Sequence, residues 1–302
     1  MSFKSGFVAV VGQPNVGKST LINNIIGKKV SIVSPKPQTT RNKIMGVWNT
    51  TDSQVVFVDT PGIHKSKTAL DKYMAKSIES ATDGIDLLLY VIDGSKPFKK
   101  EDLKTMEKYA ENSYPVFAVV NKIDLNNYEN LMPELAKLNE LKNIEQVFCI
   151  SALTNKNLEP LKEHILGKMT DTLRYFSDDQ LTDKSFGFMV AEAIREKMLW
   201  MLDDEVPHGV GVVVEEMKNY DKFQQVTATI YCEKESHKNI IIGKQGSMIK
   251  EIGRASRLAI EKMLDKQINL SLWVKVKPDW RNREGVLGTI GYATEELWLA
   301  KN

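Results

Sequence analysis

Apolar runs of strand length alternate with helical stretches along the first half of the chain. Each run is apolar at nearly every position, which is typical of strands buried on both faces of a sheet. The runs cover 7–11, 54–59, 87–93, 116–122 and 146–150. The stretches with helical character cover 19–26, 70–80, 101–112 and 133–141. This alternation predicts an α/β fold with a mostly parallel sheet and helices on both faces.

The pattern changes in the second half. An amphipathic helix is expected over 188–202, and strands are expected over 209–215 and 225–231. A second helix follows at 254–264, and 268–277 alternates as a final strand. The chain therefore divides into two domains, which we place at 1–172 and 185–302. A polar, acidic linker over 173–184 joins them.

Composition limits the class of protein. The 302 residues are 42% apolar and 26% charged, as in a globular chain of about two domains. No apolar run approaches the ~20 residues of a membrane span, so we expect a cytoplasmic protein. Cys149 and Cys232 lack the spacing of metal ligands and are expected to be small apolar residues in a reducing compartment. The chain has no heptad run or repeat, and we expect a monomer.

The stretch Gly12-Gln13-Pro14-Asn15-Val16-Gly17-Lys18-Ser19-Thr20 lies between the first strand and the first helix. It matches G-x-x-x-x-G-K-[ST], the loop whose backbone N–H groups surround a chain of phosphates. The expected nucleotide contacts here are Gly12, Asn15, Val16, Gly17, Lys18, Ser19 and Thr20. Lys18 should reach the β- and γ-phosphates, and Ser19 should bind Mg²⁺. The competing interpretation is a glycine-rich turn before a buried helix.

Two further motifs follow predicted strands, at the sheet edge where ligands bind in such folds. Asp59-Thr60-Pro61-Gly62 supplies an aspartate for Mg²⁺ and an unobstructed N–H, from Gly62, for a γ-phosphate. Asn121-Lys122-Ile123-Asp124 supplies a carboxylate, Asp124, that can accept two hydrogen bonds from guanine. Adenine would leave that carboxylate unpaired and desolvated, which costs enough free energy to select the base.

Lys122 is expected to lie over the base with its aliphatic stem. The segment Ser151-Ala152-Leu153 follows the next strand and is expected to approach guanine O6 through backbone N–H groups. Together the four motifs resemble those of the translation-factor-like GTPases. That resemblance implies GTP and GDP as ligands, with Mg²⁺.

The resemblance also locates two nucleotide-sensing segments. Thr39-Thr40 would lie in switch I, with Thr40 as the ligand of Mg²⁺ and the γ-phosphate and Thr39 as the alternative. Switch II would run from Asp59 through His64 to Thr68. Lys18, Thr40 and Gly62 are therefore the expected catalytic groups, and Ser19, Thr40 and Asp59 the expected metal ligands.

The side chains for hydrolysis are incomplete. Ile63 occupies the position where a glutamine often orients the attacking water. We therefore expect slow intrinsic hydrolysis of GTP, raised by a partner or a cation. Asn15 is at a loop position that in some relatives helps to bind K⁺, and a K⁺ ion could stabilise developing charge there. Asn15 as a turn residue only is an equal alternative.

Charge divides the second half sharply. Residues 171–233 carry 6 Lys+Arg against 13 Asp+Glu, and residues 234–283 carry 12 against 5. The net charges are thus −7 and +7, and the basic block predicts a surface for a polyanion.

Within the basic block, Gly243-Lys244-Gln245-Gly246 fits the GxxG loop with which KH domains clamp a nucleic-acid backbone. The order helix–strand–strand–helix–GxxG–helix–strand is that of a type II KH domain, an α+β fold. The expected RNA-binding residues are Ile242, Gly243, Lys244, Gln245, Gly246, Lys250 and Arg254, with Arg257 as an extension. Ile241, Ile242 and Ile249 are expected mainly in the core or groove. Trp273, Trp280 and Trp298 are expected to pack in the interior or between the domains, with base stacking as the alternative.

A GTPase domain followed by a KH domain resembles the bacterial Era family over nearly the whole chain. The resemblance implies binding to the 3′ region of 16S ribosomal RNA, a role in maturation of the 30S subunit, and loose contact with the inner membrane. One alternative is a signalling GTPase whose basic face binds anionic lipid. Another is a constitutive RNA-binding module with a vestigial nucleotide fold.

Overall fold

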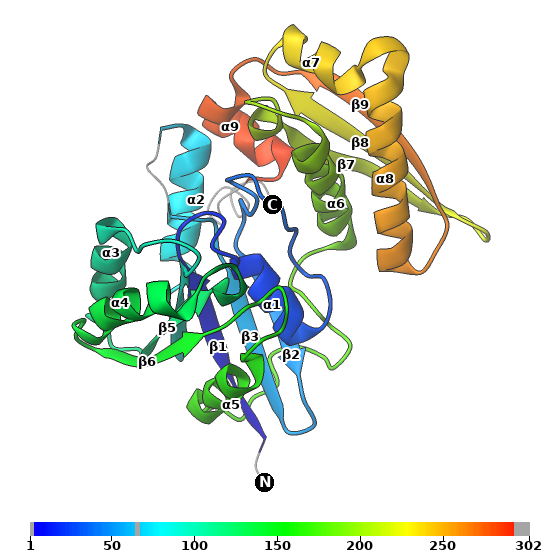
Figure 1. Ribbon diagram of the computed structural model, residues 1–302. Coiled ribbons are helices and arrows are strands. Elements are labelled where there is room, and N and C mark those ends of the chain that lie inside the picture. Colours follow the sequence, from blue (N-terminus) through cyan, green and yellow to red (C-terminus); the bar gives the residue numbers. More distant parts are fainter. Residues whose placement is uncertain (1–2, 64–66, 293–302) are drawn as a thin grey trace. The chain divides into compact units, whose positions relative to one another are not determined.

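The computed structural model describes residues 3–63 and 67–292 (Figure 1). It divides into two compact units. The first comprises Met1–Val33, Thr40–His64 and Met74–Asp183. The second comprises Lys184–Asn302 together with two short segments from the first half of the chain, Ser34–Thr39 and Lys65–Tyr73.

A six-stranded sheet forms the centre of the first unit, in the order β2-β3-β1-β4-β5-β6. Its strands are β1 (Lys4–Val11), β2 (Ile44–Asn49), β3 (Ser53–Asp59), β4 (Leu87–Asp93), β5 (Val116–Asn121) and β6 (Ile144–Cys149). Only β2 is antiparallel to its neighbour. The parallel strands end at one edge of the sheet, which gathers the polar residues that follow them.

Helices cover both faces of this sheet, as predicted (Figure 1). The helices are α1 (Lys18–Ile26), α2 (Ala69–Glu79), α3 (Lys100–Ala110), α4 (Tyr128–Asn139) and α5 (Leu158–Lys168). Alternate residues of β4 belong to different cores: Leu89 packs with α1 and α5, whereas Tyr90 packs with α3 and α4. Both cores consist of closely packed apolar side chains, which support the sheet under the loops at its edge.

A three-stranded sheet, β7-β8-β9, forms the second unit with its helices. The elements are α6 (Phe186–Met201), β7 (Gly211–Asn219), β8 (Gln224–Cys232), α7 (Glu235–Ile242), α8 (Ser247–Leu264), β9 (Ile268–Val276) and α9 (Glu284–Leu287). β7 and β8 are antiparallel, and β8 and β9 are parallel. This is the predicted α+β order, with the GxxG loop between α7 and α8.

The predicted linker belongs largely to the first unit. The side-chain carbonyl of Gln54 accepts hydrogen bonds from the N–H groups of Tyr175 and Phe176, at 2.9 and 3.0 Å. Leu181 packs against the core and accepts a bond from the N–H of Val47. A buried polar side chain on β3 thus holds the first part of this polar, acidic segment in place.

Some elements differ from expectation. β2 and α5 were not predicted, and α7 was expected as the helix before the GxxG loop but without bounds. α4 begins at Tyr128, upstream of Pro133, which lies inside it. Cys232 is buried in the second unit's core as expected, while Cys149 is partly exposed. Among the helices of the described ranges, none combines the length and the apolar character needed to cross a bilayer.

Candidate functional site

The loop between β1 and α1 has the geometry of a phosphate cradle. Gly12 has φ +147°, and a Cβ there would lie 2.2 Å from the carbonyl oxygen of Val91. Gly17 has φ +99°, and a Cβ there would lie 2.2 Å from Nδ2 of Asn121. No other residue fits either position, because both the backbone angle and the space exclude a side chain. The turn alternative would not require such close approach at both ends.

Lys18 lies in the first turn of α1 with its ammonium turned into this loop. Its Nζ donates to the carbonyls of Gly12 and Gln13, each at 3.0 Å. Burial lowers the pKa of Lys18 to about 8, against the opposing attraction of Asp59. A desolvated ammonium of this kind gains strongly from an incoming anion.

The three residues expected to bind metal lie together. Ser19 Oγ donates to Asp59 Oδ2 at 2.7 Å and lies 3.0 Å from Thr40 Oγ1. Thr40 Oγ1 is also 3.4 Å from Asp59 Oδ2. The other carboxylate oxygen of Asp59 is buried, and it has no hydrogen-bond partner within residues 3–63 and 67–292. Two hydroxyls and a carboxylate with an unsatisfied oxygen are the hard oxygen donors that Mg²⁺ prefers, so these residues fit the ion.

The pKa of Asp59 also indicates that this cluster would bind a cation. Burial raises the pKa of Asp59, and the hydrogen bond from Ser19 and the charge of Lys18 only partly oppose that rise. A bound cation would relieve this desolvation. The two threonines of switch I make different contacts. Thr39 Oγ1 does not face the metal cluster but donates to the carbonyl of Lys36 at 2.6 Å. Thr40 is the threonine that faces Ser19 and Asp59.

Gly62 follows β3 and approaches the phosphate loop from the other side. A Cβ on Gly62 would lie 2.6 Å from the Cα of Pro14. The next residue, Ile63, donates its backbone N–H to the carbonyl of Gly12 at 3.1 Å, and its side chain packs on the apolar core. Ile63 therefore supplies a backbone link and no group that could orient water. His64, in the predicted switch II, lies outside the described residues.

Asn121 connects three parts of the site. Its Nδ2 donates to the carbonyl of Val16 at 2.8 Å, and its Oδ1 accepts the N–H of Ala152 at 2.8 Å. The sequence suggested nucleotide contacts for both Asn121 and Ala152. The structure shows that these groups already bind each other, so their contact with guanine stays a prediction, as does that of Ser151 and Leu153.

Lys122 is fixed by a residue that the motif analysis missed. Its Nζ donates to the carbonyl of Asn15 at 2.5 Å and to Asp93 Oδ2 at 2.9 Å. Burial would raise the pKa of Asp93, but hydrogen bonds from Ser95 and Lys122 hold it below the usual range. The signal for Asp93 was available, since it is the polar residue that closes β4. Asp124 is exposed at the same edge, as a base-binding carboxylate requires.

The GxxG loop of the second unit exposes its backbone and its charges. Gly243 and Gly246 have φ of +73° and +78°, and Gln245, between them, has φ +54°. A Cβ on Gly243 would lie 2.7 Å from that of Met248, whereas one on Gly246 would come no closer than 4.0 Å to any atom, a methyl carbon of Ile249. The exposed side chains on the loop and on the first turns of α8 include the predicted Lys244, Gln245, Lys250 and Arg254, together with Ser247 and the acidic Glu251. The arrangement can present N–H groups and cations to a phosphodiester backbone.

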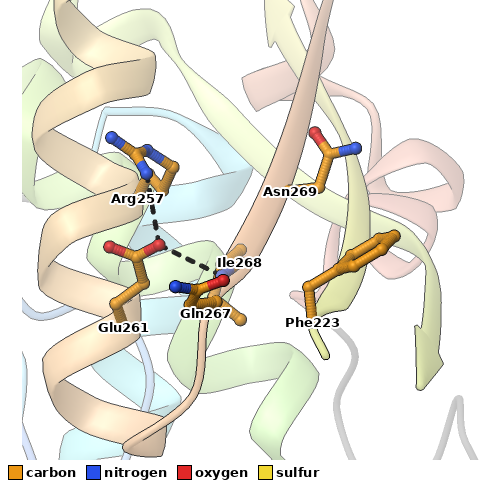
Figure 2. Close-up of a pocket in the computed structure, with 6 residues that line it drawn as sticks. All are labelled: Phe223, Arg257, Glu261, Gln267, Ile268 and Asn269. Atoms are coloured by element: carbon orange, nitrogen blue, oxygen red, sulfur yellow. Dashed lines mark hydrogen bonds and ion pairs between the residues drawn. The ribbon is translucent and has the colours of Figure 1, made fainter. Parts of the chain in front are cut away.

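Arg257 lies farther along α8, at the rim of a pocket in the second unit (Figure 2). Glu261 pairs with it at 3.3 Å and also accepts the N–H of Ile268 at 3.1 Å. The pocket is completed by Phe223, Gln267 and Asn269. Because Glu261 engages the guanidinium, Arg257 is a weaker candidate for a phosphate contact than Arg254.

The apolar residues near the loop are mostly structural. Ile241 is buried in the core, and Ile249 packs against it, while Ile242 is half-buried. Trp280 is fully buried and donates from Nε1 to the carbonyl of Gly209 at 2.9 Å. Internal packing was the wrong prediction for Trp273, which is 62% exposed on the edge strand β9. Trp298 lies outside the described residues.

Comparison with known proteins gives the same two parts. Residues 7–122 match the family model described as a 50S ribosome-binding GTPase, and residues 205–281 match that of the KH domain. The chain is 46% identical to GTPase Era of Ruminiclostridium cellulolyticum over 98% of this chain and 100% of that protein. It is 47% identical to GTPase Era of Clostridium kluyveri over 96% of this chain and 99% of that protein.

Two solved structures resemble the whole chain. One is a variant of Era from Aquifex aeolicus bound to GDP and AlF4⁻, with a TM-score of 0.92 and 36% identity. The other is Era in complex with MgGDPNP and nucleotides 1506–1542 of 16S ribosomal RNA, with a TM-score of 0.93 and 36% identity. Each covers 97% of this chain and 100% of the other.

Proposed function

From the premise that this chain belongs to the Era family of GTPases, we propose that its GTP cycle controls the binding of 16S ribosomal RNA by its KH domain. The reaction is hydrolysis of GTP to GDP and phosphate. The observation that carries the proposal is the cluster of Ser19, Thr40 and Asp59 beside the buried ammonium of Lys18, in a chain that also presents an exposed GxxG loop.

The protein's own groups divide the work at the nucleotide. The backbone of 12–17 surrounds the phosphates, and Lys18 binds the β- and γ-phosphates. Asp124 selects guanine by accepting from its two neighbouring N–H groups. Ser19, Thr40 and Asp59 would hold Mg²⁺, which when bound neutralises charge on the phosphates. Thr40 and Gly62 sense the γ-phosphate, so its loss releases their segments.

Hydrolysis is slow without help, because Ile63 cannot orient water. We propose that RNA-bound or particle-bound protein hydrolyses GTP faster, and that K⁺ stimulates through a site that includes Asn15. The left-handed conformation of Asn15, with φ +63°, turns its backbone carbonyl to Lys122, so the conformation alone also fits a turn residue. Equal rates in Na⁺ and K⁺ buffers would remove the potassium site.

The RNA partner follows from the relatives. The solved Era complex contains nucleotides 1506–1542 of 16S ribosomal RNA, and the match covers 100% of the Era chain in that structure. The family model that names the 50S ribosome covers the nucleotide half alone, without the KH domain. We therefore propose the 30S subunit as the site of action, in the cytoplasm, with the protein acting as a monomer. Contact with the inner membrane is a secondary expectation.

The decisive experiment measures GTP turnover by the full chain with a fragment of the 16S 3′ region, with 30S subunits, and with 50S subunits. Stimulation by the 16S fragment and by 30S supports the proposal, and stimulation by 50S alone contradicts it. RNA affinity measured with GDP and with GDPNP then tests the coupling, since linkage requires that RNA and nucleotide affect each other equally. Equal RNA affinity in both states would exclude it.

Flotation with vesicles of anionic lipid separates the remaining rival. A signalling GTPase with a lipid-binding face would bind the vesicles at physiological salt and would show no preference for the 16S fragment over an unrelated RNA. The proposed function predicts the reverse order of affinities.

A further inference from the structure

The segment just before Thr40 is held by a buried arginine of α6. Arg195 is 1% exposed, and its guanidinium donates to the backbone carbonyls of Gln38, at 3.4 Å, and Thr39. Glu192, one turn earlier on the same helix, binds the other side of the guanidinium through both carboxylate oxygens, at 2.7 and 2.6 Å. The planar guanidinium is thus fixed by a two-pronged ion pair and directed at two consecutive peptide carbonyls.

A second connection ties this segment to the start of α2. Gln38 Nε2 donates to Asp71 Oδ1 at 2.9 Å, and Asp71 Oδ2 accepts the N–H groups of Lys67 and Thr68 at 3.0 and 2.9 Å. Lys36 pairs with Asp203 after α6, at 3.2 Å. Residues 34–39 and 67–73 therefore form one hydrogen-bonded group with α6, and all of them belong to the second unit.

Thr40, by contrast, belongs to the first unit, where its hydroxyl faces Ser19 and Asp59. One peptide bond separates the carbonyl that Arg195 holds from the residue that faces the metal cluster. Arg195 fixes the orientation of the peptide plane between Thr39 and Thr40. Because that plane includes the N and Cα atoms of Thr40, its orientation fixes where those atoms lie. A change at α6 is thereby transmitted to the metal cluster through the backbone itself.

α6 also connects to the GxxG loop. Ile194 and Met198 of α6 lie in one core cluster with Ile252 and Ile260 of α8, and α8 begins directly after Gly246. Close-packed side chains resist small displacements, so movement of α8 is passed to α6. The same helix that holds residues 38 and 39 is thus packed on the helix that carries the RNA loop.

We infer that Arg195 is the positioning residue for Thr40, holding switch I in the orientation that binds Mg²⁺ and the γ-phosphate. The inference rests on the proposed function and adds to it the side chain through which the KH domain acts on the nucleotide site. Arg195 touches neither substrate nor metal in this role. It fixes two peptide carbonyls, with Glu192 as its anchor.

The test compares two variants of the full chain. Arg195→Lys keeps the charge beside Glu192, but its single ammonium replaces the two-pronged geometry. The double variant Glu192→Gln with Arg195→Met removes both charges together, so that neither is left buried alone. The matched control is Glu159→Gln with Lys162→Met, an ion pair of the same i, i+3 spacing on α5, with an N–O distance of 2.7 Å.

The readout is the ratio of affinities for GDPNP and GDP in the presence of Mg²⁺. Because Thr40 is expected to contact the γ-phosphate, which GDP lacks, affinity for GDP should not change. Affinity for GDPNP should fall by about tenfold, which is within the usual range of coupling between sites. The kcat for GTP should fall with it. An unchanged GDPNP to GDP ratio in both variants overturns the inference. A purely structural role would weaken both nucleotides together and also overturns it.

A third arm checks that Arg195 acts through Thr40. In a Thr40→Ala background, Arg195→Lys should have no further effect on GDPNP affinity, because the group that it positions is gone. Fully additive effects would contradict the inference. If the double variant does not fold, as judged by thermal unfolding, Arg195→Lys alone decides the matter. The binding ratio needs no hydrolysis, so failure of GTP turnover in the wild type would count against the proposed function and not against this role.

Discussion

Asn121 donates a 2.8 Å hydrogen bond from its side-chain amide to the backbone carbonyl of Val16. The bond joins the end of β5 to the phosphate loop, and the same side chain accepts the N–H of Ala152. Because Asn121 is buried, both bonds are protected from water. One side chain therefore sets the distance between the phosphate-binding and the base-binding parts of the site.

We predict that Asn121→Ala lowers the free energy of unfolding by about 2–4 kcal/mol, since it leaves a buried carbonyl and a buried N–H unpaired. GDP and GTP should lose affinity equally, because the defect lies outside the γ-phosphate site. Urea unfolding and nucleotide titration measure the two effects. Asn112→Ala, an exposed asparagine at the end of α3, is the control. Selective loss of GTP would refute this account of Asn121.

The two switch I threonines should behave differently. Thr40→Ala should reduce kcat by about tenfold to a thousandfold, as loss of a group that stabilises the transition state does, and should leave GDP affinity unchanged. Thr39→Ala should have a small effect, since its hydroxyl bonds only within residues 34–39. Steady-state hydrolysis across a Mg²⁺ titration provides the comparison. A larger loss with Thr39→Ala would reverse the assignment.

Nucleotide affinity should fall at alkaline pH. In the free protein, burial lowers the pKa of Lys18 to about 8. Bound phosphates favour the ammonium and raise that pKa, so binding takes up a proton above pH 8. By linkage the association constant should decrease by about tenfold between pH 7 and pH 9. GDP titrations over that range test the sign, and the weak residual binding of Lys18→Met should show no such slope.

Selection of guanine should depend on Asp124. Asp124→Asn replaces one of two acceptor oxygens with a donor, which opposes guanine's N–H groups. GTP affinity should fall by about a hundredfold or more, as when a buried polar pair is mismatched. Competition with ATP, with Asp52→Asn on the exposed β2–β3 turn as control, measures the selectivity. If Asp124→Asn preferred GTP over ATP as strongly as the wild type, a residue other than Asp124 would select the base.

The glycines of the KH loop can be tested separately from the nucleotide site. Gly246→Asp meets no atom closer than 4.0 Å, and aspartate tolerates the φ of +78° better than most side chains. It places a negative charge where phosphate is expected, so RNA affinity should fall by at least tenfold and GTP binding should persist. Gly291→Asp is the matched control, since Gly291 also has a positive φ, +87°, also has room for a side chain and also ends a GxxG sequence. Equal RNA binding by both variants would show that the 243–246 loop is not the contact.

Gly243→Ala should act by geometry and not by charge. A methyl group there meets the Cβ of Met248 at 2.7 Å at a φ of +73°, so the loop must change shape. RNA affinity and thermal stability should fall together. Gly246→Asp has the positive φ but no clash, so its loss of thermal stability should be smaller than that of Gly243→Ala while its loss of RNA affinity is at least as large. Gel shift with thermal unfolding distinguishes the two patterns.

Local patterns in the sequence were enough for most of the first sheet. Continuous apolar runs identified the parallel strands, and the motifs that follow them converge because parallel strands end at one edge. β2 was missed because it is a sheet-edge strand in which Met45, Trp48 and Asn49 are partly exposed, so no continuous run marks it. Alternation in β9 identified the residues that face the core, of which Ile268 is buried and the others are partly buried. The same alternation puts Trp273 with Ser271 and Lys275 on the opposite face, which the expectation of internal packing overlooked.

Contacts between distant segments could not be read from local patterns. Arg195 looked like one charge in an amphipathic helix, and nothing near it in sequence indicates that its partners are the carbonyls of residues 38 and 39. Likewise, Leu70 was assigned to a helix of the first domain, yet it is buried in a cluster with Trp280, Leu287 and Ile290. Such assignments depend on which surfaces meet, and that is decided only by the complete fold.

The membership of residues 34–39 and 67–73 in the second unit has a practical consequence. A fragment ending at Asp183 would keep the phosphate loop, Asp59 and the base-binding edge, but it would lose Arg195 and the cluster around Trp280. In that fragment the residues before Thr40 would lack their hydrogen bonds to Arg195. Kinetic constants measured on such a fragment would therefore differ from those of the full chain. A chimaera that exchanges KH domains would need to exchange residues 34–39 and 67–73 as well.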